Sequence, residues 1–203
     1  MSYSKFTKAD LKDKFGVELV LQTGLFDSAA VRPIGEWLKV YLANNTDFAI
    51  LQATEKARSE FIIAPIFAEL RQQAEAQISI FSGWELNVDV EQGLTGRCDF
   101  LVSRTPYQAN LESPIVVAVE AKQQDFDKGT TQCIAEMIAA RIFNEREGNP
   151  QTDIYGTVTT GDAWRFLVLR GQQGLIEPNL FPLKEIDKIF GILWAMTFNE
   201  ISL

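Results

Sequence analysis

Histidine is absent from the 203 residues of this sequence. This absence excludes Ser-His-Asp and Cys-His catalysis, HExxH zinc proteases and nucleases whose metal is bound by histidine. Acid–base or metal chemistry must therefore use carboxylate, Lys, Tyr or Cys side chains. Carboxylate oxygens favour hard cations, so any metal is expected to be magnesium, with manganese as the alternative.

Cysteine is scarce as well, since Cys98 and Cys133 are the only two. Neither has a His or Cys partner at zinc-ligand spacing, so no zinc site is predicted. We interpret both as small core residues, with a disulfide as the alternative.

Long apolar runs are missing too. No uninterrupted run approaches the roughly 18 residues that a membrane span needs. The first fifteen residues are polar and charged, without the apolar segment of a secretory signal. We therefore expect a cytoplasmic protein that does not insert into a membrane.

The charge balance is acidic, with 19 Lys and Arg against 27 Asp and Glu and a net charge of −8. This balance opposes a broad electrostatic grip on nucleic acid. It leaves open a local basic patch, or an acidic site that a cation neutralises. Hydrophobic residues make up 46% of the chain, which is typical of a globular protein.

The pattern of residues 1–50 predicts a helical extension to a main unit at residues 51–203. We expect the two to form one compact body. In the extension, Thr7 begins a helix that Gly16 ends, and Pro33 begins a second helix that Asn44 and Asn45 end.

The main unit alternates helices and strands. Residues 54–77 predict a helix with a kink or junction at Pro65. Three strands (84–91, 97–103, 115–119), a helix capped by Thr130 or Thr131 (128–147), two strands (154–159, 164–169) and a final helix (183–198) complete the order. This order predicts an α/β domain with a mixed sheet between helices. The apolar face of the last helix is expected to pack on the sheet, with a homodimer contact as the alternative.

Two polar positions interrupt the apolar strands. Glu120-Ala121-Lys122 ends the most apolar strand of the chain, and residues two apart share a strand face, so Glu120 and Lys122 point the same way. Such an ion pair is costly unless it is partnered. The plain alternative is a strand that reaches the surface here. Asp99 lies in the preceding strand, between Cys98 and Phe100.

The segments Gly96-Arg97-Cys98-Asp99-Phe100 and Pro114 to Val119 followed by Glu120-Ala121-Lys122 resemble the PD-(D/E)XK nuclease superfamily. The family pattern is an Asp at the start of one strand and an acidic-x-Lys on the next, although no Pro precedes Asp99 here. A Glu on the preceding helix, matched by Glu60, and a Gln on the following helix, matched by Gln132, extend the resemblance over residues 54–141 and the two later strands. It implies a restriction-endonuclease-like three-layer fold.

The resemblance also implies a site and an activity. Asp99, Glu120, the carbonyl of Ala121 and, through water, Glu60 would hold magnesium. Lys122 would orient or activate the attacking water, and Gln132 would hold Lys122 or a phosphate. Plainer roles remain open, namely Lys122 as the counter-ion of Glu120, and Glu60 and Gln132 as ordinary polar helix positions.

The expected function is a metal-dependent nuclease that hydrolyses nucleic acid, with DNA favoured over RNA. The alternative is a non-catalytic module that keeps the fold and binds nucleic acid or a protein partner.

Overall fold

The computed structural model describes residues 2–106, 109–122 and 124–202. The helices are α1 (Lys8–Phe15), α2 (Glu36–Leu51), α3 (Glu55–Arg58), α4 (Ala64–Gln73), α5 (Phe126–Arg146) and α6 (Ile186–Phe198). The strands are β1 (Glu18–Leu21), β2 (Ser79–Glu85), β3 (Arg97–Ser103), β4 (Ile115–Ala121), β5 (Asp153–Thr159), β6 (Ala163–Arg170), β7 (Gln173–Ile176) and β8 (Phe181–Pro182). Short 3-10 turns (Tyr3–Lys5, Leu183–Glu185) and a π-helical segment (Ser59–Ile63) complete the elements.

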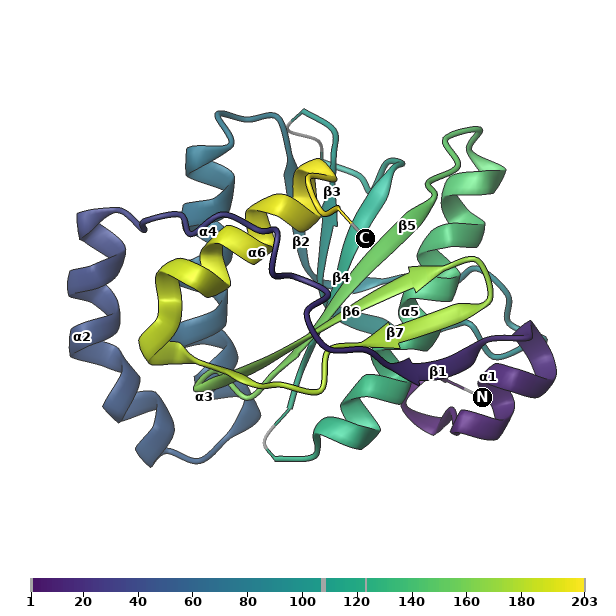
Figure 1. Cartoon of the computed structure of the whole chain (residues 1–203), viewed down its shortest axis with the longest axis horizontal. Helices are drawn as coiled ribbons and strands as arrows, with labels where there is room; N and C mark the ends of the chain where they lie inside the picture. Colours follow the sequence, from purple (N-terminus) through teal and green to yellow (C-terminus); the bar gives the residue numbers. More distant parts are fainter. Residues whose placement is uncertain (1, 107–108, 123, 203) are drawn as a thin grey trace.

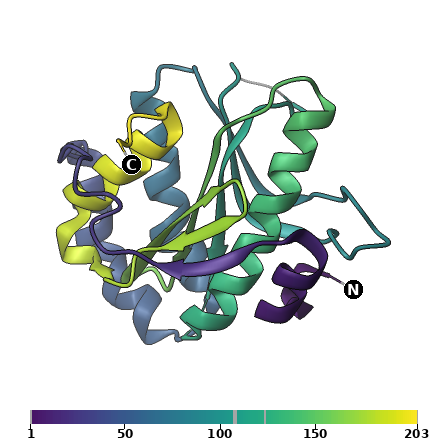
Figure 2. The same ribbon diagram turned by 45° about the vertical axis from the view of Figure 1, so that its right-hand side comes forward.

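The strands form one open mixed sheet in the order β1-β7-β6-β5-β4-β3-β2, with β8 added beside β6. The β1–β7 and β4–β5 pairs are parallel and the others antiparallel. Helices α1 and α5 lie on one side of the sheet and α2, α4 and α6 on the other (Figures 1 and 2). The α/β class with a mixed sheet flanked by helices is thus confirmed.

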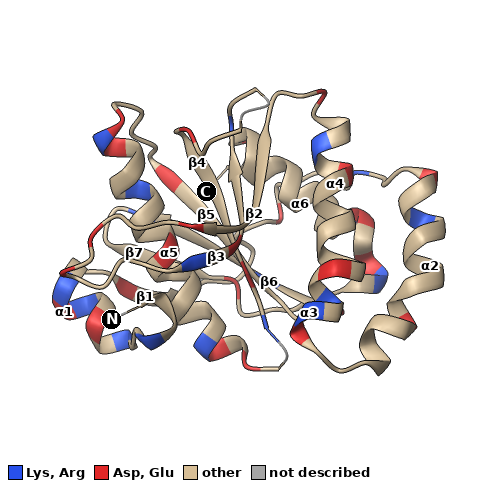
Figure 3. Cartoon of the chain, turned by 180° about the vertical axis from the view of Figure 1, so that it is seen from behind, with Lys and Arg blue, Asp and Glu red and all other residues tan. Residues whose placement is uncertain are grey.

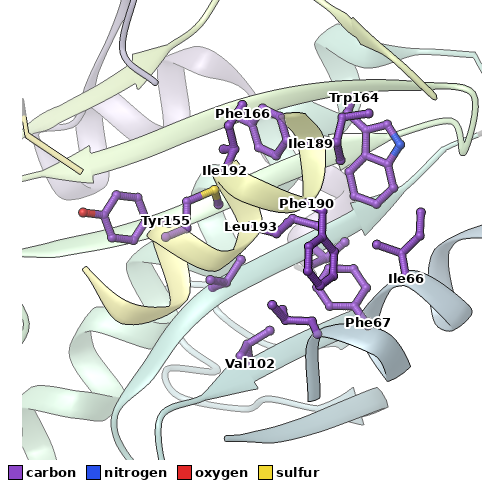
Figure 4. Packing of buried hydrophobic residues seen from close by; sticks show 14 of the residues in the cluster. Ile66, Phe67, Val102, Tyr155, Trp164, Phe166, Ile189, Phe190, Ile192 and Leu193 are labelled. Atoms are coloured by element: carbon purple, nitrogen blue, oxygen red, sulfur yellow. The ribbon is translucent and has the colours of Figure 1, made fainter. Parts of the chain in front are cut away.

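Each side of the sheet has its own hydrophobic core. Trp164, Phe166, Phe190 and Leu193 belong to the cluster under α4 and α6, and Figure 4 shows α6 packed over the strands there. A second cluster lies under α5. The apolar residues of α6 are therefore buried within the chain itself. This agrees with the expectation that the apolar face of the helix at residues 183–198 packs on the sheet.

Several expected elements agree with the structure. Thr7 caps α1 by accepting the Asp10 N–H, and Gly16 ends this helix in the left-handed conformation at φ 66°. Strands β3 to β6 lie where they are expected. Pro65 lies in the first turn of α4, directly after the π-helical segment. Because proline has no N–H to donate, the regular α-helical ladder cannot pass this point.

The predicted strand at 84–91 is misplaced, since β2 spans Ser79–Glu85. The N–H groups of Leu86 and Val88 bond to the carbonyls of Gly96 and Leu94. The alternating residues therefore belong to an irregular arm beyond the β2–β3 pair, and the strand itself begins earlier.

Three helix boundaries also differ from expectation. Pro33 does not begin α2, which starts three residues later at Glu36. Asn44 and Asn45 do not end α2, because their side-chain amides donate to the carbonyls four residues earlier and the helix continues to Leu51. Asp125, rather than Thr130 or Thr131, caps α5 by accepting the Lys128 N–H at 2.9 Å. The two threonines donate to carbonyls within the helix instead.

Three strands have no counterpart in the sequence-based order, namely β1, β7 and β8. Each has four residues or fewer, too short for a clear alternation. β1 lies within the first fifty residues and pairs with β7, more than 150 residues away in the chain.

Among the described residues, no helix has the length and apolar character to cross a membrane.

Candidate functional site

Asp99 lies where β3 and β4 separate. The β3–β4 register ends at Phe100 opposite Val119. Beyond this pair, the Asp99 carboxylate accepts the Ala121 N–H at 2.7 Å. On the opposite edge of β4, the pairing with β5 continues, and the Lys122 N–H donates to the Thr159 carbonyl at 2.8 Å. The predicted acidic pair is therefore held at one end of two neighbouring strands.

Glu120 and Lys122 form an ion pair on the α5 side of β4. The Glu120 side chain is 2% exposed and that of Lys122 is 16% exposed. Burial raises the pKa of Glu120 to about 7, Asp99 adds to this rise, and Lys122 opposes it. The pKa of Asp99 is also raised, chiefly by burial. Both carboxylates consequently lie in surroundings that penalise their negative charge.

Lys122 keeps its proton in this setting. Burial by itself would lower its pKa, but Glu120, Glu55 and Asp99 together raise the value above the ordinary one. A protonated lysine cannot accept a proton from water, so its direct contribution is positive charge and hydrogen-bond donation. The side chain also lies under α5, because a Cβ on Gly129 would approach its Cγ to 2.9 Å.

Glu136 on α5 is a residue of this site that the sequence does not single out. It is fully buried, and its carboxyl faces that of Glu120 closely enough for the two to share a hydrogen bond when one is protonated. Burial, then Glu120, raises the pKa of Glu136 well above the ordinary value. Its position 16 residues after Glu120 in the chain gives no local signal of this contact.

Gln132 lies one helical turn before Glu136 and donates to Glu136 Oε1 at 3.2 Å. It therefore supports the buried carboxyl, whereas the sequence-based expectation is a contact with Lys122 or a phosphate. Its own Oε1 has no hydrogen-bond partner among the described residues, and neither does Glu120 Oε2.

A pocket of about 260 Å³ opens beside Asp99, lined by Glu55, Lys56, Ser59, Glu60, Ser82, Asp99 and Ala121. Glu60 reaches this pocket but pairs with Lys56 at 2.9 Å, and its side chain is 54% exposed. Glu55 acts electrostatically on both Asp99 and Lys122. The structure thus adds Glu55, which sequence reasoning missed, as the carboxylate on this helical segment that acts on both strand residues.

The helical segment bordering the pocket is irregular. Ser59 and Glu60 lie in the π-helical turn, and such single turns occur frequently at functional sites. The inserted turn changes the phase of the helix, which affects which side chains face Asp99. Pro65, which lies in the first turn of α4, is the sequence signal that marks this irregularity.

The small number of grouped side-chain ligands limits how a metal ion could bind at this site. Among the residues that the structure describes, no three His, Cys, Asp or Glu side chains form a group able to hold a metal ion. Magnesium is commonly bound by one or two carboxylates, with water and substrate phosphate as its other ligands. Asp99 and Glu120 could serve as two such carboxylate ligands, and Glu120 Oε2 has no hydrogen-bond partner among the described residues. Water or substrate would have to supply the remaining ligands of the metal.

Charged residues outside the site are mixed in sign. Figure 3 shows basic and acidic residues interspersed over the helices and strands rather than gathered on one basic face. This distribution agrees with the acidic net charge. Any electrostatic contact with an anionic partner would therefore have to be local.

Changing Glu136 to Gln is expected to stabilise the metal-free protein, increasingly so as pH rises. Because its folded-state pKa is raised, wild-type Glu136 holds a proton that the unfolded chain loses above the ordinary value of 4.5. Wild-type stability therefore falls as pH rises from that value toward the folded pKa. Each unit of raised pKa is worth about 1.4 kcal/mol, or roughly 3–5 °C in melting temperature for a domain of this size.

Thermal melts in chelator at several values from about pH 4 to about pH 9 measure this effect. Glu147→Gln, an exposed position at the far end of α5, is the matched control. A Glu136→Gln difference that stays constant with pH would contradict the assignment of a buried protonated carboxyl.

Comparison with models of known protein families returned no match, and neither did comparison with curated proteins.

Proposed function

We propose that this protein is a magnesium-dependent phosphodiesterase with a restriction-endonuclease-like fold that hydrolyses nucleic acid, with DNA as the favoured substrate. The main supporting observation is the meeting of Asp99 and Glu120, from neighbouring strands, beside the protonated Lys122. The layered α/β architecture and the acidic-x-Lys arrangement at the end of β4 are in keeping with this proposal.

Asp99, Glu120 and the Ala121 carbonyl would hold the metal, which supplies Lewis-acid polarisation of a phosphate oxygen when bound. Lys122 would orient the attacking water and place positive charge beside the phosphate as negative charge develops on it. Glu136 and Gln132 would keep the Glu120 carboxylate in position from α5. Glu55 and Glu60 border the pocket through which water would approach Asp99.

A second candidate is a non-catalytic module that retains the fold. The Glu120–Lys122 ion pair and the interspersed charge with a net value of −8 favour it. In that role Lys122 serves as the counter-ion that makes a buried carboxylate tolerable, and the protein would act through a partner instead of on a phosphodiester.

The deciding experiment incubates the purified protein with plasmid, single-stranded DNA and RNA, each with magnesium, manganese or chelator. The proposal predicts cleavage that requires the metal and favours DNA. Binding to generic duplex by the protein alone should be weak, and weaker as salt rises, because the described surface lacks a broad basic face. Absence of cleavage in every metal condition, with tight binding only in the presence of a second protein, would favour the non-catalytic candidate.

A further inference from the structure

The outer side of α2 exposes apolar side chains that the rest of the described chain leaves uncovered. Trp37, Val40, Phe48 and Leu51 are 40%, 52%, 48% and 85% exposed. The helix buries Leu38, Leu42 and Ala49 on its opposite side. In Figures 1 and 3, α2 lies at the outer edge of the molecule. The uncovered side is therefore open to another molecule.

These four residues follow a regular helical pattern. At 100° per residue they fall, together with Tyr41 and Asn44, within an arc of about 100°. We call this set of six residues the α2 stripe. At 1.5 Å per residue it extends over about 21 Å, and it contains no Lys, Arg, Asp or Glu. A contiguous uncharged surface of this kind is typical of an interaction site.

Part of the stripe is held in place within the chain. The Trp37 and Tyr41 rings pack edge to face with centroids 6.3 Å apart. Phe48 packs in the same manner on Phe61, at 5.3 Å. Because these rings already have fixed neighbours, a partner that covered them would not have to order freely rotating side chains, which lowers the entropic cost of binding.

The four strongly exposed apolar residues of the stripe are spaced symmetrically about Asn44. Trp37 and Leu51 lie seven residues before and after it, and Val40 and Phe48 lie four residues before and after it. In an antiparallel pair of α2 helices crossing at Asn44, Trp37 would face the partner's Leu51, and Val40 would face the partner's Phe48. A two-fold interface requires a surface that complements itself in this manner.

We propose that this protein forms a homodimer through antiparallel pairing of the α2 stripe around Asn44. The antiparallel arrangement also sets the macrodipoles of the two helices in opposite directions, which is electrostatically favourable. A nucleic acid does not fit the stripe, because the stripe offers no basic side chain to phosphate. The dimer is independent of the proposed nuclease activity.

The interface is small. A stripe one helix wide lies at the lower end of specific interfaces, which begin at about 1,200 Å² of total buried area. Each copy has a net charge of −8, so the two repel over long range. The dimer should therefore form at micromolar concentrations and above, and salt should strengthen it by screening that repulsion.

Sedimentation of the full chain from about 1 µM to about 500 µM tests the association. The mass should approach twice the monomer value as concentration increases. Phe48→Lys and Val40→Lys should each weaken dimerisation by about tenfold or more, since each buries a charge in an apolar contact. Val90→Lys is the matched control, because Val90 is 69% exposed and lies far from α2 in the chain.

Cysteine cross-linking tests the register. Cys98 and Cys133 are both fully buried, so the wild type should not cross-link under mild oxidation. Asn44→Cys should form a disulfide-linked dimer with itself. Val40→Cys and Phe48→Cys should each cross-link poorly alone but efficiently when mixed, because each faces the other residue in the partner.

Three outcomes would overturn the proposal. The first is a monomer at every concentration tested. The second is a dimer that Phe48→Lys and Val40→Lys leave unchanged. The third is self-cross-linking of Phe48→Cys as efficient as that of Asn44→Cys, which would indicate a parallel or otherwise different pairing.

Discussion

Glu120→Gln and Lys122→Ala are each expected to reduce metal-dependent cleavage by about 100-fold or more. Each removes a charged group expected to stabilise the transition state, and loss of one such group typically costs that much. Glu120→Gln keeps the shape of a buried side chain but loses a charged ligand. Lys122→Ala removes the positive charge that the site holds next to Glu120.

The fold should survive both substitutions. Gln occupies nearly the same volume as Glu, and Lys122 lies at the margin of the core with 16% of its side chain exposed. Lys122→Met keeps most of the volume of lysine under Gly129 and should lose as much activity as Lys122→Ala. Equal loss in the two lysine variants, with unchanged circular dichroism, separates the effect of charge from that of packing.

Glu147→Gln and Lys5→Ala, both at exposed positions, are the matched controls and should cleave like the wild type. Initial rates at several substrate concentrations are the measurement. Full activity in both Glu120→Gln and Lys122→Ala would show that the cleavage comes from another site or from a contaminant.

Asp99→Asn is expected to change metal-free and metal-bound stability in opposite directions. Asp99 and Glu120 lie close enough that Asp99 raises the pKa of Glu120. Removing one charge relieves this repulsion, while the Asn carbonyl oxygen can still accept the Ala121 N–H that Asp99 now accepts. The metal-free melting temperature should therefore increase or remain unchanged.

The metal response should be largely lost in the same variant. A cation that binds only the folded wild type stabilises it by about 2.7 kcal/mol at 100 times its dissociation constant. For a domain of this size, that is roughly 5–11 °C in melting temperature. Asp99→Asn removes a charged ligand, so millimolar magnesium or manganese should raise its melting temperature far less.

Thermal melts of wild type, Asp99→Asn and the Glu147→Gln control, with and without metal, test this crossed pattern. If Asp99 is instead a structural anchor beside Lys122, Asp99→Asn should melt at a lower temperature without metal, and metal should affect neither protein. That pattern would exclude the metal site and leave the non-catalytic candidate.

Local periodicity in the sequence determined the centre of the sheet and part of the site. The apolar run at Ile115 predicts β4, and the two-residue period of a strand places Glu120 and Lys122 on one face, as found. The Thr7 cap and the Gly16 stop of α1 are likewise local, because they depend on backbone groups within a few residues.

Only the tertiary structure decided the features that depend on distant segments. Glu136 meets Glu120 because α5 packs across β4, a contact that no repeat in the sequence encodes. β1 exists because β7 supplies its hydrogen-bond partners. Glu55 acts on Asp99 because α3 and β3, which are distant in the sequence, border the same pocket. Such placements result from the packing of whole elements, whereas sequence periodicity reports only which face of one element is apolar.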